Sequence, residues 1–210
     1  MQQVPLTLDL ILRRCLELGA GREVVSVTPS GVRRDPWPEV GQRAARLSGL
    51  LDALDISVGG RVATFAWNGH RHVELHLGVP CAGRVLHPVN LRLPDEHIAY
   101  LVDLAGDEVA FVDASLTTLV ARLRHRLAVK KYVIMEDGAA IDEAFADSPR
   151  YEDLLDTLSI DAPRPHLAED DAAWICSTSG TTGRPKLVVT SHRSVYLHTH
   201  AALMVDSHAI

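Results

Sequence analysis

Short apolar runs alternate with amphipathic segments between residues 61 and 135, and this alternation constrains the fold more than any other feature of the chain. The runs have the length and the β-branched content of strands, whereas the segments between them have apolar residues at helical spacing. The predicted strands are Arg61–Trp67, Arg84–Val89, Glu108–Val112 and Lys131–Met135, and the predicted helices are His70–Ala82, Asp95–Leu104 and Leu116–Leu127. Such alternation indicates an α/β fold, with a parallel sheet, right-handed crossovers and helices on its faces.

The residues before this block predict a helix, a hairpin and a second helix. Apolar residues recur at helical spacing after Thr7, which suits an N-cap, and Gly19 suits the end of the helix. Strands over Glu23–Thr28 and Val32–Arg34 flank a Pro-Ser-Gly turn, and a long amphipathic helix follows over Pro38–Leu54.

The pattern loosens between Glu136 and Asp171, where prolines and scattered acids indicate a connector with one short helix near Tyr151–Leu158. After it we expect a strand over Ala172–Cys176, a loop, a strand over Leu187–Thr190, and a helix that begins behind Ser191 as its N-cap. The sequence therefore predicts a first α/β lobe over residues 1–161 and the start of a second α/β lobe over residues 162–210.

Composition excludes several classes of protein. With 47% hydrophobic and 23% charged residues the chain resembles an ordinary soluble globular protein, and no apolar run has the ~20 residues of a membrane span. Its net charge of −6 argues against a nucleic-acid partner. The three cysteines are widely spaced among apolar neighbours, which favours buried thiols. Arginines follow the first apolar stretch rather than precede it, so a secretory signal is not indicated and we expect a cytoplasmic protein.

The loop from Ser177 to Lys186 combines glycines, hydroxyl side chains and one lysine directly after a predicted buried strand. Gly180 and Gly183 can adopt positive φ and bring backbone N–H groups close to an anion, while hydroxyls and Lys186 add donors and a compact positive charge. Each hydrogen bond to a charged group contributes about 1.5–3 kcal/mol, so several together can hold a triphosphate without a basic surface.

The glycine and lysine spacing differs from that of a Walker A loop, because Lys186 is followed by a strand signal and not by a helix. Lysine is rare in this sequence, at positions 130, 131 and 186 alone, whereas arginine is frequent. A lysine in this loop therefore indicates a need for a compact, rotatable charge and not for a planar guanidinium. The alternative interpretation is a surface loop in which the lysine occurs by chance.

Four segments resemble the adenylate-forming (AMP-binding) superfamily, which contains acyl-CoA synthetases, peptide-synthetase adenylation domains and beetle luciferases. The loop and the residues after the next strand resemble its phosphate-loop signature, and two upstream segments resemble the N-terminal part of medium- and long-chain fatty-acyl-CoA synthetases in particular. These segments are Ser177–Lys186, Ser191–Ser194, Arg61–Leu75 and Gly83–Leu93.

This resemblance implies an ATP-dependent, AMP-forming fatty-acid–CoA ligase, with Mg²⁺ and CoA as the further cofactors of the complete enzyme. By position, the nucleotide-binding residues are Thr178, Ser179, Gly180, Thr181, Thr182, Gly183 and Lys186. The resemblance places no catalytic residue and no metal ligand within residues 1–210.

Three positions depart from the family pattern. Ser177 stands where an aromatic residue is usual, Gly60 where an aspartate is common, and Leu187 where a glycine usually follows the lysine. A leucine at a position that needs positive φ would strain the loop by about 1–3 kcal/mol.

The resemblance implies that residues 1–210 are less than half of a complete family member, and we expect the family's C-terminal domain to be absent from them. We therefore expect residues 1–210 alone to be inactive, with an unpaired sheet edge and an uncovered apolar face. A homodimer, or a separate chain with the missing half, is the expected kind of partner. Two alternatives remain: a non-catalytic nucleotide-binding or assembly module, and an adenylating enzyme for another carboxylic acid.

Several histidines and aromatic residues are weaker candidates for a functional role. His70, His72 and His76 include a helical i, i+4 pair, but no cysteine or carboxylate completes a metal site, so a helix-surface or partly buried role is expected. For His192, beside the loop, a structural role is preferred over a ligand contact. Phe65, Trp67 and Trp174 fall on predicted strands and are expected in the core.

Overall fold

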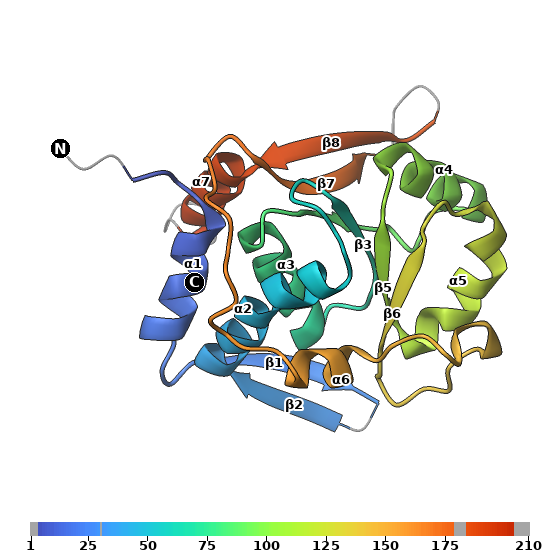
Figure 1. Cartoon of the computed structure of the whole chain (residues 1–210), viewed down its shortest axis with the longest axis horizontal. Coiled ribbons are helices and arrows are strands. Elements are labelled where there is room, and N and C mark those ends of the chain that lie inside the picture. The colour runs from blue at the N-terminus through green and yellow to red at the C-terminus, as the bar shows by residue number, and fades with distance from the viewer. Residues whose placement is uncertain (1–3, 30, 179–183, 204–210) are drawn as a thin grey trace.

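The computed structural model describes residues 4–29, 31–178 and 184–203, and it shows a mainly parallel sheet with helices on both faces (Figure 1). The sheet has six strands in the order β6-β5-β3-β4-β7-β8; β8 runs antiparallel to β7 and the other neighbouring pairs are parallel. The strands are β3 (Arg61–Phe65), β4 (Val85–Pro88), β5 (Val109–Asp113), β6 (Lys131–Met135), β7 (Ala172–Thr178) and β8 (Lys186–Ser191). The predicted α/β class is confirmed.

Seven α-helices and a separate antiparallel hairpin complete the described part of the chain. The helices are α1 (Leu8–Leu18), α2 (Trp37–Ala53), α3 (His70–Cys81), α4 (Asp95–Ala105), α5 (Thr117–Leu123), α6 (Tyr151–Asp156) and α7 (His192–Ala202). The hairpin joins β1 (Glu23–Thr28) to β2 (Gly31–Pro36) and contacts α2 and α3. These elements confirm the sequence predictions for the N-terminal helix, the hairpin and the alternating block.

The pleat of the central strands divides the core between two helical layers. Val109 and Phe111 of β5 face a cluster with side chains of α2, α3 and α6, whereas Ala110 and Val112 face a cluster with side chains of α4 and α5. All of β5 is buried, as expected for a parallel strand covered on both faces. Figure 1 shows the same arrangement, with α2 and α3 on one side of the sheet and α4 and α5 on the other.

The predicted helix over Leu116–Leu127 is interrupted in the structure. A 3₁₀ turn over Ala114–Leu116 precedes α5, and a second one over Arg124–Arg126 follows it. The Thr117 hydroxyl donates a 2.6 Å hydrogen bond to the carbonyl of Ala114, a local bond that tightens the first turn. Apolar periodicity detects the buried face of such a segment but not the change of helix type.

β7 and β8 extend the sheet formed by the earlier strands. β7 pairs with β4 through Leu86 and Trp174, and β8 is the outermost strand on this side in the described part of the chain. Val188 and Val189 of β8 are exposed, so the expected sheet edge is present. The division into lobes at residue 161 stays a prediction.

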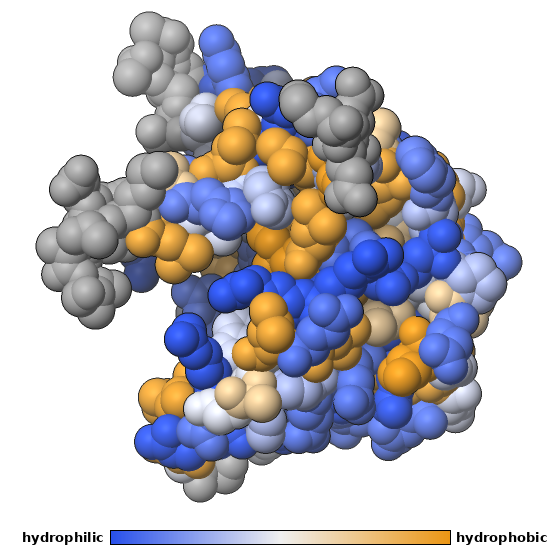
Figure 2. Space-filling view, turned by 90° about the vertical axis from the view of Figure 1, so that its left-hand side faces the viewer, coloured by the Kyte–Doolittle hydropathy of each residue, from blue (hydrophilic) through white to orange (hydrophobic). Residues whose placement is uncertain are grey.

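The two ends of the described chain meet through α1 and α7. α1 packs against α2, α3 and α7, and a small apolar cluster that includes Leu8, Leu12 and Val195 joins them. Viewed from this side in Figure 2, apolar side chains gather in the upper part of the face. No helix in residues 4–29, 31–178 and 184–203 is long and apolar enough to cross a membrane.

Candidate functional site

The stem of the predicted phosphate loop is an antiparallel ladder. Thr178, the last residue of β7, pairs directly with Lys186, the first residue of β8, and both are exposed. Directly opposite residues project to the same face of a sheet, so the Thr178 hydroxyl and the Lys186 ammonium group lie on one face, at the two ends of the loop that joins β7 to β8. The other predicted binding residues, Ser179, Gly180, Thr181, Thr182 and Gly183, lie outside the described residues.

Leu187 occupies a regular strand position, paired with Ser177 across the same ladder. Among the described non-glycine residues, Asp55 alone has positive φ, so the backbone at Leu187 takes an ordinary strand conformation. The strain predicted for this departure is therefore not found. Because the register is maintained on both sides of Leu187, the position of Lys186 is fixed by sheet hydrogen bonds and not by glycine flexibility.

The residues just before Lys186 are held against α4. Pro185 is buried, and the Arg184 guanidinium lies over the Tyr100 ring with its central carbon 5.2 Å from the ring centroid. Figure 1 shows the beginning of β8 beside α4. The C-terminal end of the loop, at Arg184 and Pro185, is thus held by contacts with α4.

His192 follows the Ser191 N-cap and has a structural position. Ser191 Oγ accepts a hydrogen bond from the Ser194 amide, which confirms the predicted cap of α7. His192 is fully buried, its Nδ1 accepts a 3.2 Å hydrogen bond from the Leu8 amide, and burial lowers its pKa. This neutral ring joins α7 to α1, as the preferred interpretation expects.

The histidines of α3 are packed against neighbouring side chains. His72 shares a 3.0 Å hydrogen bond with the Thr64 hydroxyl, and its ring centroid lies 4.5 Å from that of His76, which also meets the edge of Trp174. Burial lowers the pKa of His70, His72 and His76 to about 4. These contacts give His72 and His76 a structural role.

A crevice that the sequence did not indicate lies at the carboxyl ends of β3, β5 and β6. It encloses about 800 Å³ and is lined by the hairpin, by the start of α3, by Asp113 at the end of β5 and by Glu136 and Asp137 after β6. Asp113 accepts a 2.7 Å hydrogen bond from the Trp67 amide, and burial raises the pKa of Asp113 to about 6. An aspartate that ends a buried strand and is followed by Ala-Ser is the signal in the sequence that could have indicated this crevice.

Trp67 corrects one expectation. Phe65 is fully buried and Trp174 is half-buried, but Trp67 is 57% exposed because β3 ends at Phe65. The Trp67 indole N–H donates a 3.0 Å hydrogen bond to the Ser115 hydroxyl at the rim of the crevice. The prediction of a core residue at position 67 was wrong, since the sequence pattern extended the strand too far.

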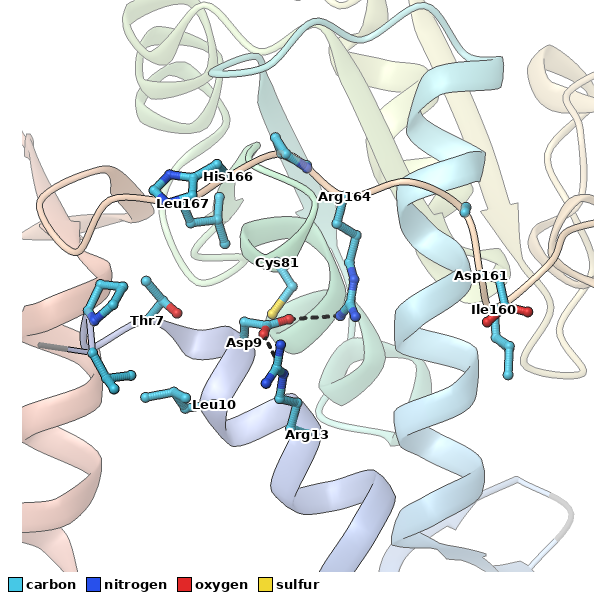
Figure 3. Close-up of a pocket in the computed structure, with 14 residues that line it drawn as sticks. Thr7, Asp9, Leu10, Arg13, Cys81, Ile160, Asp161, Arg164, His166 and Leu167 are labelled. Carbon is cyan, nitrogen blue, oxygen red and sulfur yellow. Dashed lines mark ion pairs between the residues drawn. The ribbon is translucent and has the colours of Figure 1, made fainter. Parts of the chain in front are cut away.

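A second cavity, of about 620 Å³, lies between α1, the end of α3 and residues 160–167 (Figure 3). Asp9 lies between Arg13 and Arg164, and each guanidinium is 2.9 Å from one of its carboxylate oxygens. Cys81 is buried beside them, and burial raises the pKa of its thiol. The ion pair of Asp9 with Arg164 joins α1 to the connector, and Cys81 of α3 adds a buried thiol to the wall of the cavity.

Comparison with known proteins identifies a family. The model of the AMP-binding enzyme family matches residues 21–209. A long-chain-fatty-acid–CoA ligase of Thermus thermophilus is 39% identical over 211 residues, which cover 100% of this chain and 38% of the ligase. A medium-chain-fatty-acid–CoA ligase of Ectopseudomonas oleovorans is 36% identical, with 99% of this chain and 38% of the ligase covered.

A third relative and two solved structures extend the comparison. A 3-methylmercaptopropionyl-CoA ligase of Ruegeria lacuscaerulensis is 36% identical, with 96% of this chain and 38% of the ligase covered. The anthranilate CoA ligase AuaEII in complex with anthranoyl-AMP has a TM-score of 0.83 at 20% identity, with 98% of this chain and 38% of that chain covered. The fatty acyl CoA synthetase of Mycobacterium tuberculosis has a TM-score of 0.73 at 25% identity, with coverages of 91% and 36%. The chain thus spans about 38% of the length of the three curated relatives.

Proposed function

Because the chain belongs to the AMP-binding enzyme family, we propose that its β7–β8 loop grips the phosphates of Mg-ATP in an acyl-CoA ligase that activates fatty acids. The single observation that supports the binding role is the pairing of Thr178 with Lys186 at the mouth of the loop. This pairing places a neutral donor, the Thr178 hydroxyl, and a cation, the Lys186 ammonium group, at the two ends of the loop.

The reaction proposed for the complete enzyme has two steps. A carboxylate oxygen of the fatty acid attacks the α-phosphorus of ATP, the bond to the bridging oxygen of the β-phosphate breaks, and pyrophosphate leaves. The thiolate of CoA then attacks the acyl carbonyl carbon and AMP leaves with the electron pair of the broken mixed anhydride.

The contribution of this chain is electrostatic. Charge accumulates on the departing pyrophosphate, so donors already in place around the β- and γ-phosphates lower the barrier. In the proposal Lys186 neutralises that charge and the Thr178 hydroxyl donates to a phosphate oxygen. In the proposal Mg²⁺ enters with ATP as part of the substrate.

A fatty acid is the proposed acyl substrate because two of the relatives at 36–39% identity are named for medium- and long-chain fatty acids. The Ruegeria relative at 36% is named for 3-methylmercaptopropionate, and one at 31% from Arabidopsis thaliana for benzoate. A different carboxylic acid is therefore the second candidate substrate.

We infer that residues 1–210 bind nucleotide without completing adenylation, because they span about 38% of these relatives. The proposed location is the cytoplasm. The proposed partner is a second copy of the chain, or a polypeptide that corresponds to the remainder of the relatives.

ATP–pyrophosphate exchange tests the proposed reaction. Exchange is measured with octanoate, palmitate, benzoate and 3-methylmercaptopropionate, first with residues 1–210 and then with the protein extended to the length of the relatives. We expect no exchange from the short chain and exchange driven by a fatty acid from the long one. Exchange by the short chain would contradict the inferred incompleteness, and exchange driven only by another acid would contradict the substrate.

A further inference from the structure

Arg184, two residues before Lys186 in the predicted phosphate loop, lies over the aromatic ring of Tyr100 on α4. Its guanidinium carbon is 5.2 Å from the ring centroid, within the range of a cation–π contact. We propose that Tyr100 is a positioning residue for nucleotide binding and acts through Arg184. This inference rests on the proposed role of the loop, and it assigns a function to a helix outside the loop.

One face of α4 carries an aromatic ring and two carboxylates next to Arg184. Glu96, Tyr100 and Asp103 recur at i, i+4 and i+7, which places them on one face of the helix. Together with Arg126 and Arg184 they line a cavity of about 460 Å³. The two carboxylates supply negative potential around the guanidinium, and the ring supplies the flat face on which it lies.

The contact fixes the chain close to Lys186. Arg184 is joined to Lys186 through Pro185, whose ring restricts its backbone and whose side chain is buried. Thr178 is fixed on the other side by its pairing in the sheet. A loop whose two limbs are held before the ligand arrives loses less conformational entropy when it binds.

Arg184 could act instead by direct attraction to a phosphate, and the two roles give different results. Direct attraction needs the cation but not the ring. Positioning needs both, because the ring has no other route to the nucleotide in the proposal. The side chain of Tyr100 therefore separates the two interpretations.

The test is a double-mutant cycle on the 210-residue chain with Mg-ATP as the titrant. Tyr100→Leu, Arg184→Leu and the double variant are compared with wild type, with Tyr100→Phe as the variant that retains the ring. Tyr196→Leu, whose ring contacts His200 on α7, is the matched control. Thermal unfolding of each variant reports whether the fold is retained.

We expect Tyr100→Leu to weaken ATP binding by about 2- to 5-fold, the effect of an exposed cation–π contact, without a change in melting temperature. Tyr100→Phe should restore wild-type affinity, and Tyr100→Leu should have no further effect once Arg184 is leucine. Unchanged affinity in Tyr100→Leu, or an equal loss in both backgrounds, would overturn the positioning role.

Lys186→Ala separates this inference from the proposed function. If Lys186→Ala weakens binding and Tyr100→Leu does not, the positioning role is wrong and the loop assignment holds. If the wild-type chain has no affinity for ATP, or if Lys186→Ala retains full affinity, the loop assignment and the positioning role are both overturned.

Discussion

The Tyr151 hydroxyl donates a 2.7 Å hydrogen bond to Glu74 Oε2, and both side chains are completely buried. The other carboxylate oxygen of Glu74 accepts a 2.7 Å hydrogen bond from Arg43 Nε. Arg43 also contacts Glu152, which in turn pairs with Arg71. This network joins α2, α3 and α6 beneath the sheet and leaves the buried charge of Glu74 compensated.

Tyr151→Phe should destabilise the fold. The substitution removes one donor from a buried carboxylate and leaves that oxygen without a partner, which costs about 1–3 kcal/mol. Urea unfolding followed by circular dichroism measures the loss, and Tyr196→Phe on α7 is the matched control. An unchanged unfolding free energy would show that Oε2 of Glu74 finds another donor.

Acid should destabilise the protein through the three histidines of α3, of which His70 and His72 are buried and His76 is half-buried. Their folded-state pKa of about 4 lies below the ordinary 6.5, so the unfolded chain binds more protons between these values. Stability is therefore complete above pH 6.5 and is lost as the pH falls toward 4, by at most about 3 kcal/mol for each histidine.

His76→Phe isolates one of these histidines. The new ring can occupy the space beside Trp174 but does not titrate, so the melting temperature should fall less steeply between pH 6.5 and 4 than in wild type. His125→Phe, at an exposed position, is the control and should leave the slope unchanged. Equal slopes for His76→Phe and wild type would contradict the assignment of an uncharged ring at position 76.

Asp113 should have the opposite dependence on pH. Its pKa is raised from 3.8 to about 6, so the folded state binds more protons than the unfolded state between these values, and stability falls as the pH rises through them. Asp113→Asn keeps an acceptor for the Trp67 amide without the charge. Its melting temperature relative to wild type should be higher at pH 7 than at pH 4, whereas Asp147→Asn at an exposed position should show no such change.

Lys186→Arg should weaken nucleotide binding less than Lys186→Ala. Arginine retains the positive charge but replaces a compact, rotatable ammonium with a planar group that needs a different approach to phosphate. Titration with Mg-ATP should place its affinity between those of wild type and Lys186→Ala. Affinity equal to wild type would show that charge alone is required at this position.

The alternation from Arg61 to Met135 predicted the fold because strands buried on both faces differ in pattern from the amphipathic helices between them. The strand order was not predictable in this way, since the pairing of Leu86 with Trp174 joins residues far apart in the chain. The same reason explains why the contacts of Glu74 with Tyr151 and of His192 with Leu8 were missed.

For the candidate site, the sequence predicted the residue types and their spacing, and the structure adds the contacts that hold these residues in place. The loop composition identified Lys186, but its cross-strand pairing with Thr178 and the support of Arg184 by Tyr100 depend on the packing of β8 against α4. Trp67 was misplaced because an apolar residue beyond a strand end looks like part of the strand. Side-chain exposure at such ends is decided by tertiary contacts.

Calorimetric titration of the folded 210-residue chain with Mg-ATP tests the central claim most directly. Lys186→Ala is compared with Lys130→Ala, a substitution at an exposed lysine near β6. Loss of a charged donor to phosphate should weaken binding at least about tenfold in Lys186→Ala, while Lys130→Ala binds as wild type does. Equal affinity in all three proteins, or no affinity in the wild-type chain, would contradict the account.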